Sequence, residues 1–226
     1  MRETPDLSRL ALHLRTPVYR YHQHQGDTND CGPFSVAIAA NAVLGEERFD
    51  GRTVAREMNR PAVRIRPFPH AILYRVRDGV TFPWGIVHYL RQHGIPARWS
   101  PFGTLSRLRR SLVGDQITLV MVAEPLRWQG RRYAGWAHVK IPFGYAADRG
   151  FVFVDPALAP DPDAPDRWRR HGLGWQREEA FLREWRWLFR TYVEVGQVVR
   201  RRARRGAGRP ARDWREAWNE RRAVAR

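Results

Sequence analysis

The chain has 226 residues, of which 43% are hydrophobic and 12% aromatic, so it can build the core of one large domain with appendages and is not generally disordered. Its single cysteine, Cys31, excludes an internal disulfide and a multi-cysteine zinc site. A net charge of +17 raises the question of a nucleic-acid partner, which depends on where along the chain the charge lies.

The first half of the chain predicts mainly helices, identified from apolar residues at helical spacing. The most distinctive run is small and apolar nearly all round, with Pro33 in its first turn and Gly45 as its stop, which is typical of a buried helix. Before it, a polar leader predicts only a short strand around 17–21, and a later proline-rich excursion over 59–79 predicts irregular structure. The expected helices cover residues 32–44, 52–58, 83–93 and 104–112, and a strand is expected over 95–99.

The second half predicts mainly strands, which are short apolar runs bounded by turn residues. The stretch 124–130 is rich in turn residues, and four prolines mark 156–165 as a loop. A late helix over 176–189 places Phe181 and Trp185 on one face. The expected strands cover residues 117–122, 136–143, 151–154 and 191–195.

The positive charge is concentrated at the end of the chain. Residues 200–226 hold eleven arginines and three acidic residues, which accounts for +8 of the net charge of +17. We therefore expect a leader segment over 1–24, one domain over 25–199 and a basic, arginine-rich tail over 200–226. Within the domain the aromatic residues lie at core spacing instead of alternating with basic residues, which disfavours nucleic acid as a partner. No segment approaches the ~18 apolar residues of a membrane span, so we expect a cytoplasmic protein without one.

Cys31 is a candidate nucleophile because of its position at the head of the buried helix. The positive end of a helix dipole favours the thiolate, which is the nucleophilic form of cysteine. A free cysteine is also among the most buried residue types, so a packing role stays open on this residue alone. A cysteine nucleophile needs a base, and the base needs a group that orients it.

His138 is the histidine best placed to act as that base. It opens an apolar strand, and the next strand ends at Asp155. Because antiparallel neighbours bring the start of one strand beside the end of the other, we expect His138 and Asp155 to lie close together. His22 and His24 alternate in the leader, but no carboxylate or cysteine cluster completes a metal site with them, so we interpret both as surface residues and expect no metal.

Gln25 is a candidate oxyanion donor. An amide a few residues before the nucleophile can share an oxyanion hole with the backbone N–H of Cys31. The alternative for Gln25 taken singly is a solvated loop residue.

These residues occur in a recognisable order. Gln25 precedes Asp30-Cys31-Gly32-Pro33 and a small-residue helix, a later strand reads Trp136-Ala137-His138-Val139, and another strand ends in Asp155-Pro156. In this order they resemble the papain-like cysteine peptidases of the bacteriocin-processing, double-glycine leader peptidase family and its stand-alone relatives. The resemblance covers about 25–195 and implies an α+β, papain-like fold, in which an N-terminal helical part packs on a C-terminal antiparallel β-sheet.

The resemblance also implies roles for the four candidates. Cys31 would be the nucleophile, His138 the general base and acid, Asp155 the group that orients the imidazole, and Gln25 the oxyanion donor. The reaction would be hydrolysis of a peptide or amide bond through a thioester acyl-enzyme, with a peptide or protein substrate and no cofactor. The excursion over 59–79 looks like an insertion and the basic tail has no counterpart in the family, so the identity of the substrate and the oligomeric state stay open.

Two other functions are compatible with the sequence. The same thioester can be intercepted by an amine, which would make the protein an acyl or peptidyl transferase. Alternatively, the protein is a non-catalytic basic module that binds nucleic acid or an acidic partner. Product analysis separates the first alternative from hydrolysis, and salt-dependent retention on nucleic acid after removal of the tail would favour the second.

Overall fold

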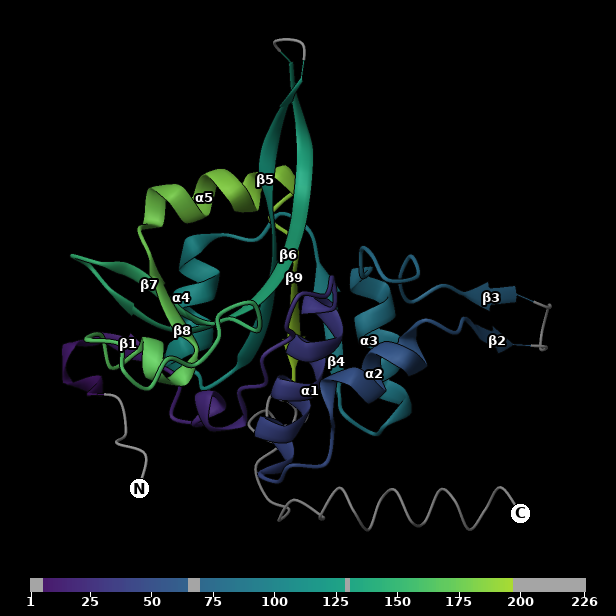
Figure 1. Ribbon diagram of the computed structural model, residues 1–226, viewed down its shortest axis with the longest axis horizontal. Helices are drawn as coiled ribbons and strands as arrows, with labels where there is room; N and C mark the ends of the chain where they lie inside the picture. Colours follow the sequence, from purple (N-terminus) through teal and green to yellow (C-terminus); the bar gives the residue numbers. More distant parts are fainter. Residues whose placement is uncertain (1–5, 65–69, 129–130, 197–226) are drawn as a thin grey trace, which may run out of the picture. The chain divides into compact units, whose positions relative to one another are not determined.

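Helices occupy the first half of the chain and strands most of the second half, so the protein belongs to the α+β class (Figure 1). The computed structural model describes residues 6–64, 70–128 and 131–196. The α-helices are α1 (Cys31–Leu44), α2 (Gly51–Met58), α3 (Pro83–Gln92), α4 (Leu105–Val113) and α5 (Glu178–Trp187). The strands are β1 (Leu12–His13), β2 (Ala62–Arg64), β3 (His70–Ile72), β4 (Ala97–Ser100), β5 (Ile117–Trp128), β6 (Arg131–Ala146), β7 (Gly150–Val154), β8 (Leu173–Gln176) and β9 (Tyr192–Val195). Short 3-10 helices are η1 (Leu7–Arg9), η2 (Val18–Tyr21) and η3 (Arg169–His171).

The chain divides into two units, Met1–Gly196 and Gln197–Arg226, and all the described residues belong to the first. The predicted tail over 200–226 lies outside the described residues. The sequence set residues 1–24 apart as a leader, but their described part, 6–24, contributes Leu14 and Val18 to the core of the first unit and pairs through β1 with β6. These residues are therefore packed with the body of that unit.

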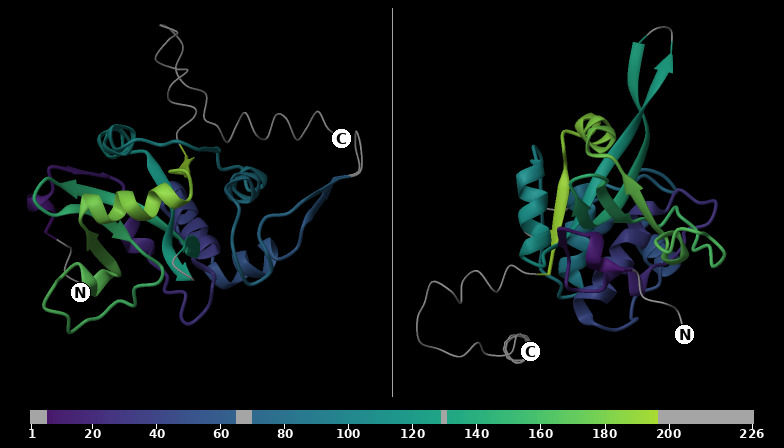
Figure 2. Two further views of the ribbon diagram at one scale, coloured as in Figure 1. Left: turned by 90° about the horizontal axis from the view of Figure 1, so that it is seen from above. Right: turned by 90° about the vertical axis from the view of Figure 1, so that its left-hand side faces the viewer.

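An antiparallel sheet runs through the first unit in the strand order β4-β9-β5-β6-β7-β8, and β1 also pairs with β6. Helix α1 packs on the central strands β5 and β6, α2 packs on α1, and α3 packs on β4 and β9 at one edge of the sheet (Figures 1 and 2). Helix α4 contacts β1, β5 and β6, and α5 packs mainly on β5. In the described chain, β9 pairs with 117–120 of β5 and β7 pairs with 141–146 of β6. The outer parts of β5 and β6 pair with each other and form a ribbon that extends well beyond the neighbouring strands (Figure 1).

Helix α1 is enclosed by the rest of the fold. Every residue from Cys31 to Ala42 is buried, because small side chains let β5, β6, α2 and α3 approach the helix from all sides. The helix ends at Gly45, whose φ of 75° lies in the left-handed region and whose N–H reaches the Asn41 carbonyl oxygen at 2.8 Å. The predicted buried helix and its stop are thus confirmed.

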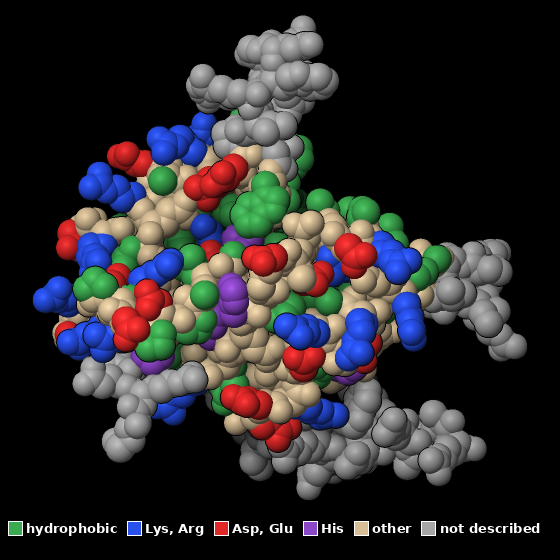
Figure 3. Space-filling model, in the orientation of Figure 1, with side chains coloured by type: hydrophobic (Ala, Val, Ile, Leu, Met, Phe, Trp, Pro, Cys, Tyr) green, Lys and Arg blue, Asp and Glu red, His purple; other side chains and the backbone are tan. Residues whose placement is uncertain are grey.

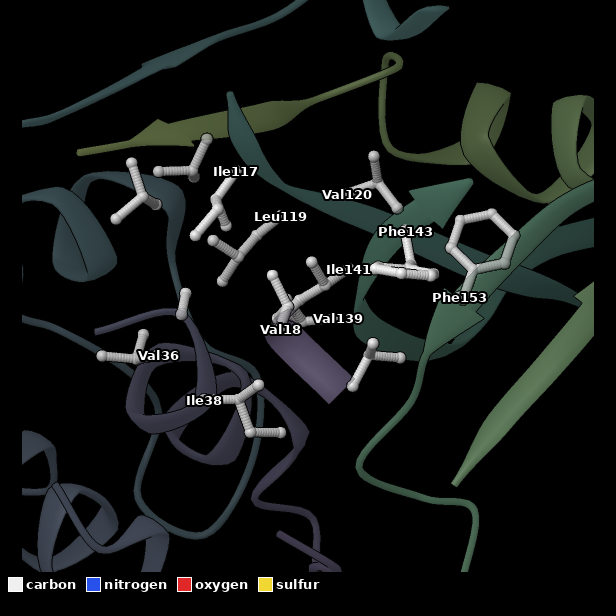
Figure 4. Close-up of a cluster of buried hydrophobic side chains, with 14 of the residues drawn as sticks. Val18, Val36, Ile38, Ile117, Leu119, Val120, Val139, Ile141, Phe143 and Phe153 are labelled. Carbon is white, nitrogen blue, oxygen red and sulfur yellow. The ribbon is translucent and has the colours of Figure 1, made fainter. Parts of the chain in front are cut away.

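The core lies between α1 and the central strands. Val36 and Ile38 of α1 join Leu119 of β5 and Val139 and Ile141 of β6 in one cluster of apolar side chains (Figure 4). Each such side chain, once fully buried, contributes about 1.5–3 kcal/mol to folding. This packing holds the head of α1, which carries Cys31, against β6, which carries His138.

The predicted helices are found within one or two residues of their expected bounds, but several strands differ. The strand expected around 17–21 is instead η2, a 3-10 turn in which the Arg20 N–H reaches the Pro17 carbonyl oxygen at 3.0 Å. The excursion over 59–79 contains the antiparallel strand pair β2–β3, and its Arg75 forms an isolated bridge with Thr81 just after it. The strand β8 was not expected, because it is short and is held by pairing with β7.

The largest difference concerns the turn expected over 124–130. Strand β5 continues to Trp128, and the register with β6 shifts between Ala123 and Pro125. The extra residue lies on β6, between Ala134 and Ala137, and Pro125 pairs opposite Ala134 directly beside this bulge, which is one of the places where a strand tolerates proline. Pairing with β6 therefore overrides the local turn signal.

The surface mixes charges of both signs. On the face drawn in Figure 3, Lys and Arg side chains are interspersed with Asp and Glu and do not form one continuous basic patch. Across residues 6–64, 70–128 and 131–196, no helix combines the length and apolar character that crossing a membrane requires.

Candidate active site

Cys31 begins α1 and is nearly buried, with 8% of its surface exposed. Its Sγ lies 4.0 Å from the Ala137 carbonyl oxygen of β6, which is a weak S–H···O contact. Gly32 follows at a position where a side chain has no room, because an added Cβ would lie 2.5 Å from the Thr81 Cβ. Thr81 thereby packs directly on the first turn of the helix that carries the thiol.

A pocket of about 200 Å³ opens beside Cys31. Val80 and Trp136 contribute half-exposed apolar side chains to its walls, which suits the apolar parts of a peptide or a similar ligand. The pocket is lined by Asn29, Cys31, Gly79, Val80, Thr81, Met121, Trp136, Ala137, His138 and Val139.

His138 lies in β6, opposite Val122 of β5, and only 5% of its surface is exposed. Its Nε2 lies 2.7 Å from Asp155 Oδ1, so the expected closeness of these two residues is found. The Trp136 indole stacks on the imidazole with ring centroids 5.0 Å apart and planes 11° from parallel. One face of the imidazole is therefore covered by an aromatic ring, and one edge is held by a carboxylate.

The pair His138–Asp155 is charged at neutral pH. Burial opposes ionisation of the imidazole, but its hydrogen bond to Asp155 and the proximity of Cys31 raise the pKa of His138 to about 9. Burial likewise opposes ionisation of Asp155, yet its hydrogen bond to His138 and the charge of the imidazolium lower the pKa of the carboxyl group. The other ring nitrogen, Nδ1, is buried and has no hydrogen-bond partner among the described residues.

The backbone around Asp155 is fixed from several sides. Asp155 Oδ1 also accepts the Ala157 N–H at 2.9 Å, and the Asp155 N–H donates to the Gly172 carbonyl oxygen at 3.2 Å. The Asp155 carbonyl oxygen lies 2.9 Å from Nε2 of His22. His22, interpreted from sequence as a surface residue, is thus half-buried and in contact with a candidate site residue.

Gln25 is buried. It is held beside the loop that follows Asp155, because its backbone N–H donates to the Pro156 carbonyl oxygen at 2.9 Å. Its side-chain Nε2 donates to the Thr28 carbonyl oxygen at 2.6 Å, and its Oε1 is buried without a partner in the described chain. Gln25 does not line the pocket next to Cys31. The structure thus places Cys31 and His138 at one pocket and Asp155 behind the imidazole, with Gln25 set back from them.

Sequence reasoning missed Arg75, whose side chain is completely buried. Its Nη1 lies 2.6 Å from Asp30 Oδ1, and its Nη2 donates to the carbonyl oxygens of Asn29 and Gly79 at 3.2 and 3.0 Å. The excursion over 59–79 is therefore tied to the residue that precedes Cys31. No local pattern marks Arg75, since it lies in a segment where arginines and prolines alternate as they do in solvated loops.

No cluster of three or more His, Cys, Asp or Glu side chains suited to a metal ion occurs within residues 6–64, 70–128 and 131–196. No protein-family model and no curated protein sequence matches this chain. Among solved structures, the chain is similar to one titled "putative C39-like peptidase" from Bacillus anthracis, with 14% sequence identity and a TM-score of 0.54. The alignment covers 82% of this chain and 97% of that one. At this identity the similarity shows only that the two proteins share a fold.

Proposed function

We propose that this protein is a cysteine peptidase or amidohydrolase with a papain-like fold. The observation that carries the proposal is the buried His138–Asp155 hydrogen bond of 2.7 Å, at a pocket that α1 enters with its first residue, Cys31. The similarity to the Bacillus anthracis structure supports it, since that protein is described as a C39-like peptidase. A structural cysteine would not require a charged imidazole and carboxylate to be buried at the same pocket.

In the proposed mechanism the resting site is a thiolate–imidazolium pair, in which His138 already holds the proton of the Cys31 thiol at Nδ1, the nitrogen without a hydrogen-bond partner in the described chain. The Sγ lies against the carbonyl of the neighbouring residue, Ala137, so a small side-chain rotation turns it toward the imidazole. Asp155 holds the opposite edge of the ring and stabilises the imidazolium that forms. The thiolate of this pair lies at the head of α1, where negative charge is favoured.

The thiolate then attacks the carbonyl carbon of the substrate, and the new C–S bond gives a tetrahedral oxyanion. Backbone N–H groups at the start of α1 are free to donate to this oxyanion, and Gln25 supplies a further donor if its amide turns from Thr28 toward the pocket. His138 returns the proton to the leaving amine, the C–N bond breaks, and a thioester remains on Cys31. Water, deprotonated by His138, hydrolyses the thioester and releases the thiolate.

Alkylation with iodoacetamide at neutral pH tests the thiolate–imidazolium pair. Because Cys31 is the only cysteine in the sequence, the mass added to the protein reports this residue alone. We expect His138→Ala to slow alkylation at least about tenfold, since the neutral thiol is far less nucleophilic than the thiolate. His24→Ala is the matched control, because His24 is exposed and lies near Cys31 in the sequence, and it should leave the rate unchanged. Equal rates in wild type and His138→Ala would contradict the proposal.

Hydrolysis itself is tested with a mixture of peptides and product analysis by mass spectrometry. Cleaved products carrying a free carboxyl group, lost in Cys31→Ala, are the expected result. Products joined to an added amine would instead assign acyl transfer to the same site. Cleavage that persists in Cys31→Ala would exclude Cys31 as the nucleophile.

A further inference from the structure

His22 is a half-buried histidine that the proposed mechanism does not use. It follows η2 in the N-terminal segment, and its Nε2 lies 2.9 Å from the carbonyl oxygen of Asp155, 133 residues away in the sequence. The ring lies directly on Gly172, where an added Cβ would be 2.3 Å from Nε2. Gly172 in turn accepts the Asp155 N–H at 3.2 Å, so His22 is packed on both partners of that backbone hydrogen bond.

The contact fixes which ring nitrogen carries a hydrogen. A carbonyl oxygen only accepts hydrogen bonds, so Nε2 must carry the hydrogen. The opposite nitrogen, Nδ1, is buried and has no partner among the described residues. In the neutral ring Nδ1 is an unused acceptor, whereas in the imidazolium it would be a buried N–H without an acceptor, which is costly.

The charged groups around His22 either lower its pKa further or are too weak to cancel the lowering that burial causes. Burial lowers the pKa of His22 and outweighs the hydrogen bond to the Asp155 backbone and the negative charge of Asp155, which raise it. His24 in the same segment and His171 at the end of η3 lower the pKa further when they are protonated. The ring therefore stays neutral while it is packed against Gly172, and it can take up a proton only by leaving this position.

We propose that His22 is a positioning residue that holds Asp155 against His138 while its ring is neutral, and that protonation of His22 at mildly acidic pH releases Asp155. The inference rests on the proposed function, because it assigns to the N-terminal segment the control of that same site. His22 contacts neither the pocket nor Cys31, so it acts through the backbone of Asp155.

The first test measures the pKa of His138 by nuclear magnetic resonance, which needs no substrate. His22→Leu removes the N–H donor at similar volume, and it should lower the pKa of His138 by about one unit or more as Asp155 loosens. His22→Gln keeps a donor near the position of Nε2 and should leave the pKa of His138 close to the wild-type value. An unchanged His138 titration in folded His22→Leu overturns the inference.

The second test follows the rate of Cys31 alkylation between about pH 5 and pH 8, the range in which histidines titrate. Wild type should lose reactivity toward the acidic end, His22→Gln should lose it at a pH lower by about one unit, and His24→Gln should match wild type. An acidic limb identical in wild type and His22→Gln overturns the inference even if His22→Leu does not fold.

Failure of this inference and failure of the proposed function give different results. If the function is wrong, His138→Ala alkylates as fast as wild type and no peptide is cleaved. If only the positioning role is wrong, His138→Ala is slow and peptides are cleaved, but the two His22 variants behave as wild type does.

Discussion

The charge of Asp155 can be tested apart from its shape with Asp155→Asn. The amide keeps an oxygen that can accept the Ala157 N–H, now held at 2.9 Å, and the Nε2 hydrogen of His138. The substitution therefore removes the negative charge with little change in packing. The pKa of His138 should fall well below about 9, since the carboxylate that chiefly opposes the effect of burial is gone and only Cys31 still raises this pKa.

The expected size of the effect follows from linkage. A shift of the His138 pKa from 6.5 to about 9 corresponds to about 3 kcal/mol, because the imidazole is almost fully buried. The folded-state pKa is raised, so this stabilisation is fully present below pH 6.5 and is lost as the pH rises through 9. Wild type should thus lose about 3 kcal/mol of unfolding free energy across this window, whereas Asp155→Asn should lose little of it.

Urea unfolding at about pH 6, 7.5 and 9 measures the difference. In the folded protein at neutral pH, alkylation of Cys31 should be slower in Asp155→Asn than in wild type, since a neutral imidazole stabilises the thiolate less than an imidazolium does. A variant whose stability falls with pH as steeply as that of wild type would refute the assignment of the raised pKa to Asp155.

Three further substitutions or deletions test how the site is supported. Arg75→Met should cost about 3–5 kcal/mol in unfolding free energy, because it leaves Asp30 without its buried partner, and urea unfolding at neutral pH measures this. Gly32→Ala should cost about 1–3 kcal/mol and slow alkylation, since its Cβ overlaps Thr81, and Thr81→Gly in the same chain should restore part of the loss. Truncation after Val199 should leave the melting temperature within a few degrees of the full chain, because the removed segment is rich in arginine and offers few apolar residues for burial, and a collapse in calorimetry would contradict it.

Local patterns were sufficient for the parts of the site that lie on regular elements. Small apolar residues closed by Gly45 predicted α1 and placed Cys31 at its head, where the structure has it. The alternation of apolar strands and turns predicted that His138 and Asp155 would meet, and they are hydrogen-bonded. In both cases the predicted contact depends on a helix end or on antiparallel neighbours, which residue spacing determines. The catalytic roles of Cys31, His138, Asp155 and Gln25 stay predictions.

Only the tertiary structure shows which distant residues hold the candidate site residues and their neighbours in place. Arg75 reaches Asp30 across 45 positions of sequence and His22 reaches Asp155 across 133, from segments that lack periodicity. Strand β5 runs through a turn signal because β6 pairs with it along its length. A single sequence shows local conformational propensities and the spacing of apolar residues. A buried charge or imidazole outside the regular elements is stabilised only by the partners that folding brings to it. Those partners are therefore visible only after the chain has folded.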